Sequence, residues 1–161
     1  MKLNSDGCDA GNPGLAGCGG VVRDSHGDWV TGFSRHIGIT NSFVAELWGL
    51  RDGLMLCSNI PALIVEMDAK SIVDIFCRTG YVNEVISPIL DDCRMLINNF
   101  QQIQVNHVFR QSNRCADALA RIGADQVLDF RSFESPPVDV FDLVEQDKSG
   151  LYFNRLCPVP G

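Results

Sequence analysis

The segment that most limits the possible folds is a short apolar run, Ala62–Met67, which ends in Asp68. Asn59-Ile60-Pro61 comes directly before it and ends the preceding helical pattern. A run of this length and composition is typical of a strand buried on both faces of a parallel sheet. Such a strand is covered by helices, so the run predicts an α/β domain.

Helical periodicity is clearest in the residues before this run. Over 42–57 apolar side chains recur at steps of four, three, four and three, which marks one face of a helix. A short helix is predicted over 70–78, and another over 87–100, where Pro88 stands at the first helical position. A last helix is predicted to end near residue 125, with Asn113 or Ser112 as its cap.

The remaining patterns predict strands over 1–6, 19–24, 29–37 and 103–110. A Gly-, Asn- and Pro-rich segment from Gly7 to Gly20 is interpreted as a loop. The order β-β-β-α-β-α-α-β-α implies a mixed five-stranded sheet, with three antiparallel leading strands and helices on its faces. We expect one domain over 1–125 and a C-terminal appendage over 126–161, with a short helix near 138–147 and an irregular tail.

Three acidic residues stand where a carboxylate is costly unless it has a partner. Asp6 ends the first predicted strand and Asp68 ends the buried run. Glu46 shares a helix face with Phe43 and Leu50. Buried carboxylates pair, protonate or bind metal. Because strand ends and neighbouring helices meet at one edge of an α/β sheet, we expect these three side chains to form one site.

Asp117 is a fourth candidate, at the start of the predicted last helix and facing Leu119 and Ala120. Its position alone could also be explained by a favourable interaction with the helix dipole. Four carboxylates without His or Cys partners suit hard cations, Mg²⁺ or Mn²⁺, rather than zinc. Two such ions about 4 Å apart can activate water and stabilise the leaving oxygen of a phosphodiester. The residues therefore predict metal-dependent phosphoryl transfer.

The overall charge opposes tight, nonspecific binding of phosphate. The formal net charge is −7 and the pI is about 4.8, although bound cations would reverse the sign at the carboxylates. Seven cysteines form no C-x-x-C pair, so we expect buried, reduced thiols in an intracellular compartment, nuclear or cytoplasmic. With no apolar signal-peptide core and no run of roughly 18 apolar residues, neither secretion nor membrane insertion is expected.

The motifs around these carboxylates resemble a known family. Residues 6–14, DGCDAGNPG, are similar to the D-G-[SA]-x-x-x-N-P-G opening of type 1 ribonucleases H. Ala45-Glu46-Leu47, Glu66-Met67-Asp68 and residues 113–120 complete the D-E-D-D set of that family in order. The resemblance covers about residues 2–124 and implies a ribonuclease-H-like fold.

Residues 47–54 and 105–110, and the tail that begins at Pro136-Pro137, resemble a plant subgroup of these domains. Domains of that subgroup occur alone or at the end of non-LTR retrotransposon reverse transcriptases. The chain begins directly at its first strand, so we expect a monomeric domain derived from, cut from or tethered to a reverse transcriptase polyprotein.

The resemblance implies hydrolysis of the RNA strand of an RNA–DNA hybrid with two Mg²⁺ or Mn²⁺ ions. Asp6 would bridge both ions, Glu46 and Asp68 would complete one coordination shell, and Asp117 would complete the other.

The resemblance also implies substrate contacts. Asn12 would contact the ribose 2′-OH, the group that distinguishes RNA from DNA. The RNA backbone would be approached by Gly7, Cys8 and Gly11. The DNA strand would be contacted by Asn41 and Ser42.

Two basic residues are auxiliary candidates. Arg110 precedes Asp117 by seven residues, at a position where another branch of the family carries an arginine, and could steady the scissile phosphate. The alternative is a solvated surface arginine. Lys70 is either a phosphate contact or a solvated lysine at a helix start.

Other residues weigh against strong binding or a catalytic histidine. His107 falls inside an alternating strand and is interpreted as a packed strand residue rather than a proton-transfer group. Asp9 adds a negative charge to the RNA-facing segment. Residues 80–102 contain Arg94 as their one basic residue, whereas stronger binders of the family carry a basic protrusion there. Affinity should therefore be modest and salt-dependent.

Two alternatives remain at this point. A non-catalytic nucleic-acid-binding or protein-interaction module that retains the fold is favoured by the acidic charge and disfavoured by the complete carboxylate set. Another enzyme of the superfamily is less consistent, since Asp6-Gly7-Cys8 lacks the D-x-E of the exonucleases and an integrase would have Glu in place of Asp117.

Overall fold

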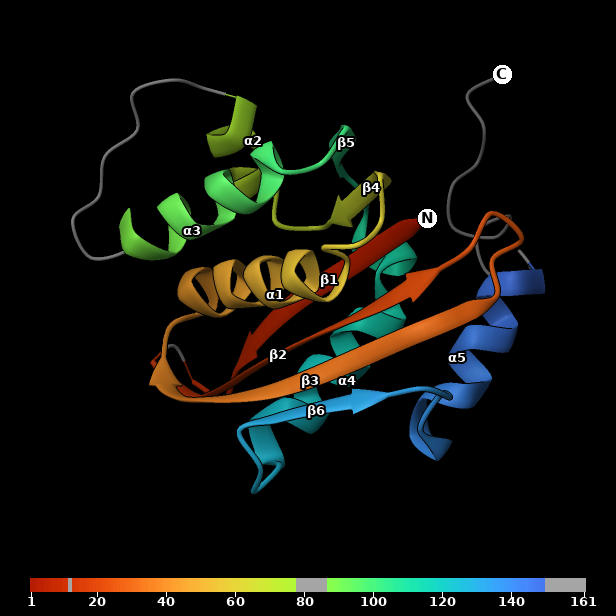
Figure 1. Ribbon diagram of the computed structural model, residues 1–161. Coiled ribbons are helices and arrows are strands. Elements are labelled where there is room, and N and C mark those ends of the chain that lie inside the picture. The colour runs from red at the N-terminus through yellow and green to blue at the C-terminus, as the bar shows by residue number, and fades with distance from the viewer. Residues whose placement is uncertain (12, 78–86, 150–161) are drawn as a thin grey trace, which may run out of the picture.

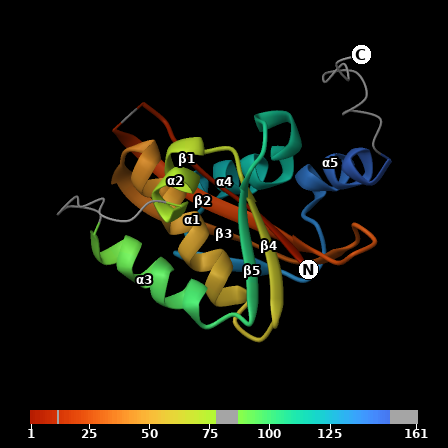
Figure 2. The same cartoon turned by 90° about the horizontal axis from the view of Figure 1, so that it is seen from above.

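The protein is a mixed six-stranded sheet with helices on both faces (Figures 1 and 2). The computed structural model describes residues 1–11, 13–77 and 87–149. The strands are β1 Lys2–Asp9, β2 Gly14–Arg23, β3 Trp29–Thr40, β4 Ala62–Met67, β5 Gln102–His107 and β6 Phe130–Phe133. The helices are α1 Ser42–Leu56, α2 Lys70–Cys77, α3 Ser87–Asn98, α4 Arg114–Asp125 and α5 Val138–Ser149, with a 3₁₀ turn, η1, at Arg110–Ser112.

The strands lie in the order β5-β4-β1-β2-β3-β6. The first three are antiparallel, β4 and β5 run parallel to β1, and β6 pairs antiparallel with β3. The predicted α/β class and mixed sheet are confirmed, but the predicted count of five strands is wrong by one. β6 has four residues and lies at a sheet edge, where its pairing depends on β3, a hundred residues earlier, rather than on a local pattern.

Residues beyond 125 contribute to this architecture. Phe130 of β6 stacks on Phe33, with ring centroids 5.9 Å apart. The short helix expected near 138–147 is α5, whose Val140 and Val144 are buried against α4 and β2. A domain boundary at residue 125 stays a prediction.

The interpretation of Gly7 to Gly20 as a loop is wrong, because β1 continues to Asp9 and β2 begins at Gly14. These glycines let helices approach the sheet. A Cβ at Gly7 would overlap the backbone of α1, and one at Gly19 would overlap the backbone of α4. The glycine pattern therefore reflects close helix–sheet packing, which brings both helices against the end of β1.

The hydrophobic core has two parts, one on each face of the sheet. Helices α1, α2 and α3 pack on one face around Leu3, Leu47 and Met67. On the other face α4 and α5 pack on β2 around Val21 and Leu119 (Figure 2). Among the described residues, no helix has the length and apolar character needed to cross a bilayer.

Candidate active site

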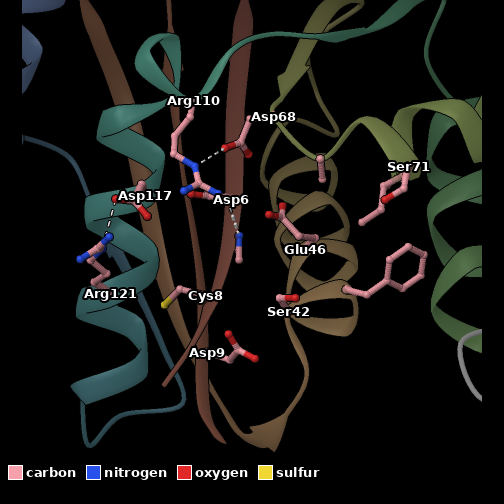
Figure 3. A pocket seen from close by; sticks show the side chains of 14 residues that line it. Asp6, Cys8, Asp9, Ser42, Glu46, Asp68, Ser71, Arg110, Asp117 and Arg121 are labelled. Atoms are coloured by element: carbon pink, nitrogen blue, oxygen red, sulfur yellow. Dashed lines mark hydrogen bonds and ion pairs between the residues drawn. The ribbon is translucent and has the colours of Figure 1, made fainter. Parts of the chain in front are cut away.

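The candidate site lies where β1 extends past the end of β4. The parallel pairing of these strands runs from Lys2–Ile64 to Asn4–Glu66, so Asp6 is two residues beyond the last paired position. There α1 approaches from one face of the sheet and α4 from the other, and residues of both line an open cavity of about 450 Å³ (Figure 3). This geometry brings together side chains that are far apart in sequence.

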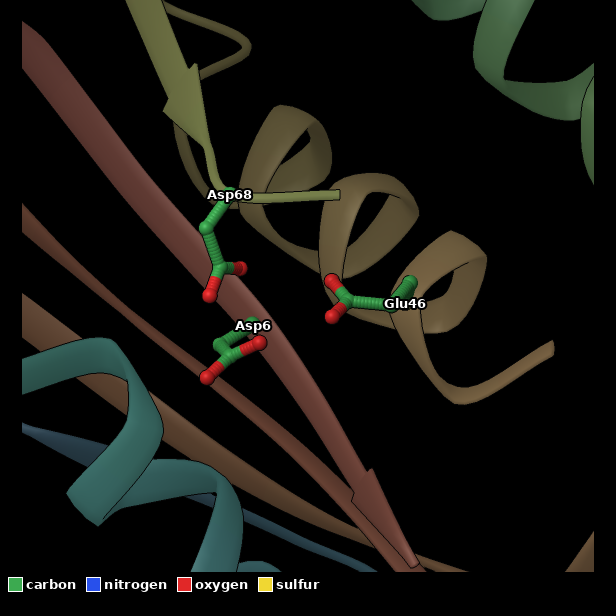
Figure 4. Close-up of side chains that lie close together, drawn as sticks. All are labelled: Asp6, Glu46 and Asp68. Atoms are coloured by element: carbon green, nitrogen blue, oxygen red, sulfur yellow. The ribbon is translucent and has the colours of Figure 1, made fainter. Parts of the chain in front are cut away.

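Three carboxylates converge in this cavity from three elements. Asp6 comes from β1, Glu46 from α1, and Asp68 directly follows β4; one oxygen from each lies within 4.8 Å of the others (Figure 4). Glu46 Oε2 is buried and has no hydrogen-bond partner. An unpaired buried carboxylate oxygen beside two more carboxylates fits an oxygen-coordinated hard cation.

Burial strongly perturbs this cluster. Asp6 is 5% exposed, and its burial, with smaller repulsion from Asp68 and Asp117, raises its pKa to about 7. Burial and the neighbouring Asp6 carboxylate also raise the pKa of Glu46 far above its usual range. Without a cation, the pair therefore retains at least one proton at neutral pH, and a bound cation would favour its release.

Asp117 lines the same cavity but is not part of the group of three. Its Oδ2 lies 3.1 Å from Arg121 Nε, one turn later on α4. Arg121 was not a candidate from the sequence, although its i,i+4 spacing from Asp117 on a predicted helix was a usable signal. The structure thus places the fourth predicted carboxylate at the rim, in an exposed ion pair (Figure 3).

Arg110 also reaches the cavity. Its Nε lies 3.6 Å from Asp68 Oδ2, while its side chain is 88% exposed. The side chain therefore stands over the carboxylates from the solvent side, with most of its donors accessible.

The predicted substrate residues fall into two groups. Gly7, Cys8 and Ser42 line the cavity, and so does Asp9. Gly11 is exposed outside the lining, with a φ of 127°. Asn12 lies outside the described residues, so its predicted 2′-OH contact stays a prediction.

Asn41 and Lys70 make local contacts. The side chain of Asn41 caps α1, where its Oδ1 accepts a hydrogen bond from the Val44 amide at 2.9 Å. Lys70 Nζ lies 2.9 Å from Asp74 on α2, and Lys70 does not line the cavity. These contacts neither require nor exclude a role in substrate binding.

Two interpretations of single residues were wrong. His107 ends β5 but is exposed rather than packed, because β5 is an edge strand; its ring contacts that of Phe109 edge-on. Asn113 stands at the N-cap position of α4, yet its side chain makes no capping bond. Instead it turns into the protein, toward Ser5 and Asp68.

Five cysteines, Cys8, Cys18, Cys57, Cys93 and Cys115, are free thiols, and all of these but Cys8 are buried. Cys8 lines the cavity, where burial raises its pKa to about 11. A thiol with such a pKa is neutral at physiological pH and a poor nucleophile or metal ligand.

The chain is similar to known proteins in sequence and in fold. Residues 4–123 match the sequence profile of a family described as reverse transcriptase-like. An Arabidopsis thaliana protein with the provisional name ribonuclease H protein is 37% identical over 153 residues, which are 93% of this chain and 24% of that protein. The chain thus spans about a quarter of the length of this curated relative.

Solved structures agree on the fold. RNase H1 from the halophilic archaeon Halobacterium salinarum superposes with a TM-score of 0.72 at 25% identity, over 77% of this chain and 96% of that one. LC11-RNase H1, solved in complex with an RNA/DNA hybrid, superposes with a TM-score of 0.70 at 26% identity, over 77% and 96% of the two chains.

Proposed function

The chain belongs to the reverse transcriptase-like family and has the ribonuclease H fold, and from that premise we propose that it is a metal-dependent endonuclease that hydrolyses the RNA strand of RNA–DNA hybrids. The observation that carries the proposal is the convergence of Asp6, Glu46 and Asp68 in an open cavity at the ends of the central strands β1 and β4. Carboxylates without nitrogen or sulfur ligands favour Mg²⁺ or Mn²⁺.

In this proposal Asp6, Glu46 and Asp68 would hold the cations, and Asp117, now ion-paired with Arg121, would supply a further carboxylate ligand. When bound, two divalent ions supply activation of water and stabilisation of the leaving oxygen of the phosphodiester. Arg110 is exposed above Asp68 and can donate hydrogen bonds to a phosphate that enters the cavity.

The RNA strand is proposed to pass over the end of β1, along Gly7 and Cys8, with Ser42 at the start of α1 on the opposite side of the cavity. The LC11-RNase H1 complex supports a hybrid as the ligand class. The net charge of −7 opposes nonspecific binding to the phosphate backbone, so the domain alone should bind the hybrid weakly.

The acidic charge also favours a second candidate, a module that keeps the fold and binds nucleic acid or protein without catalysis. Tethering to a larger protein is consistent with the quarter-length match to the plant relative and would raise the effective concentration of substrate.

A cleavage assay decides between the two functions. An end-labelled RNA–DNA hybrid is incubated with the protein in Mg²⁺, in Mn²⁺ and in EDTA, beside RNA and DNA duplexes of the same sequence. We expect RNA-strand cleavage with either ion, none in EDTA, and a loss of at least about a hundredfold in Asp68→Asn. Asp91→Asn, the same chemical change on an exposed residue of α3, is the matched control and should behave as the unaltered protein. Equal product from Asp68→Asn, or binding without any cleavage, contradicts the enzyme and supports the non-catalytic module.

A further inference from the structure

A buried pair of asparagines lies behind the carboxylate cluster. Asn113, at the junction of η1 and α4, is 1% exposed, and Asn4, on β1, is 2% exposed. Buried amides are costly unless their donors and acceptors are used. What these amides bond to therefore indicates why they are there.

The hydrogen bonds of Asn113 lead to the site. Its Nδ2 donates to the carbonyl oxygen of Ser5 at 2.9 Å and to Asp68 Oδ1 at 3.4 Å, and its Oδ1 accepts from Asn4 Nδ2 at 3.2 Å. The amide cannot be reversed, because Oδ1 would then face the Ser5 carbonyl and the Asp68 carboxylate, which are both acceptors. Asn4 also donates to Glu66 Oε1 at 3.4 Å, which secures the far end of the chain of amides.

Asp68 is the member of the cluster that most needs such support. It follows β4 and precedes α2, outside both elements, so no regular backbone structure fixes its side chain. Its Oδ2 faces Arg110, whose side chain is 88% exposed and gives a solvent-screened contact. Asn113 holds the other oxygen from the buried side.

A neutral amide suits this place. An arginine or lysine there would fix the carboxylate but cancel the charge that attracts a cation, whereas an amide donates a hydrogen bond and leaves the charge intact. An asparagine at this position ordinarily caps its own helix with its side chain. The side chain of Asn113 makes no such bond and points into the protein instead, which is consistent with this role.

We propose that Asn113 is a positioning residue for the metal site, and that it orients Asp68 from the buried side so that Oδ2 points into the cavity. The inference rests on the function proposed above and adds to it a residue that touches neither cation nor substrate. Partners of this kind change metal affinity by about 10- to 100-fold when they are removed.

The test is Mn²⁺ binding, measured by titration calorimetry on the full chain without nucleic acid. Asn113→Ala should weaken Mn²⁺ binding by about 10- to 100-fold. In an Asp68→Asn background, the same substitution should change the remaining affinity by less than about threefold, since the contact it supports is already gone. Asn4→Ala removes the donor to Asn113 Oδ1 but leaves the bond from Asn113 Nδ2 to Asp68, so it should weaken Mn²⁺ binding less than Asn113→Ala does. Asp91→Asn, on the exposed surface of α3, is the control and should bind Mn²⁺ as the unaltered protein does.

The outcomes separate the inference from the function. If the unaltered protein binds no Mn²⁺, the proposed function falls and the inference falls with it. If it binds Mn²⁺ and Asn113→Ala binds it equally tightly, or loses affinity equally in both backgrounds, the inference alone is overturned. Should Asn113→Ala not fold, the side-chain amide NMR signals of Asn113 in the unaltered protein decide: we expect them to shift as Mg²⁺ saturates the site, and unmoved signals overturn the proposal.

Discussion

Replacing Asp6 by asparagine should stabilise the metal-free protein at pH 8. Asp6 is 5% exposed, and burial raises its pKa from 3.8 to about 7. Asparagine has nearly the same shape as aspartate. It keeps an oxygen that can accept the hydrogen bond from the Gly7 backbone N–H, which is 3.0 Å long. The substitution therefore removes a buried charge with little change in packing.

The magnitude follows from the two pKa values. A difference of about three pH units at about 1.4 kcal/mol per unit corresponds to about 4 kcal/mol between full protonation and full ionisation. Because the pKa in the folded state lies above that in the unfolded state, this carboxyl favours folding at low pH. Its contribution is complete below about pH 4 and is lost as the pH rises through about 7. Between pH 5 and pH 8 the loss is about 3 kcal/mol.

Urea unfolding in EDTA at pH 5 and at pH 8 measures this contribution. Relative to the unaltered protein, Asp6→Asn should gain about 3 kcal/mol more at pH 8 than at pH 5, or roughly 6–12 °C in Tm. Adding Mg²⁺ should stabilise the unaltered protein at pH 8 and leave Asp6→Asn unchanged, since a ligand stabilises only the state that binds it.

Asp91→Asn is the control, because the side chain of Asp91 is 72% exposed; it should follow the unaltered protein at both pH values. The reasoning is refuted if Asp6→Asn is no more stable than the unaltered protein at pH 8 in EDTA, or if the two lose stability in parallel from pH 5 to pH 8.

Three further predictions concern packing, a buried ion pair and the cavity rim. Gly7→Ala should destabilise the fold by about 3 kcal/mol in urea unfolding, because its Cβ would overlap the backbone of α1, which cannot move independently; a change below about 1 kcal/mol contradicts this. Asp147→Ala should cost about 3–5 kcal/mol by the same measurement, because it leaves Arg23, 14% exposed and 3.0 Å from Asp147, without its partner; an unchanged midpoint argues against it. Arg110→Ala should lower kcat on a hybrid by about tenfold without lowering Tm, since the side chain is 88% exposed; equal kcat would assign Arg110 to the solvated surface.

Two controls accompany these variants. Gly27→Ala places a Cβ in open space at a φ of 81°, so it tests backbone strain without a clash and should cost less than Gly7→Ala. Arg94→Ala removes an arginine from the exposed face of α3 and should leave kcat unchanged.

The local pattern of the sequence was sufficient for much of the fold. The apolar run that became β4 and the stripe that became α1 were predicted within one or two residues, because periodicity and a proline break are properties of neighbouring residues. The structure of the segment from Gly7 to Gly20 was predicted wrongly. Its glycines allow close packing against α1 and α4, and a local sequence pattern carries no information about those contacts.

The sequence by itself also singled out Asp6, Glu46 and Asp68, since each interrupts an apolar strand or helix face. It could not rank them against other buried carboxylates. Asp52 is 3% exposed and so is as deeply buried as Asp6, but it forms ion pairs with Arg35 and Arg51.

The tertiary structure decided which carboxylates are compensated and which are not. Whether an arginine reaches a buried acid depends on strand register and on the angle at which a helix crosses the sheet, as with Arg23 and Asp147, 124 residues apart. A contact between residues 45 positions apart likewise turns the side chain of Asn113 away from its helix toward Asp68. What distinguishes the candidate metal site is that Asp6 is buried and Glu46 half-buried, and that neither carboxylate forms an ion pair with any described residue. Only the tertiary arrangement of β1, β4 and α1 creates that condition.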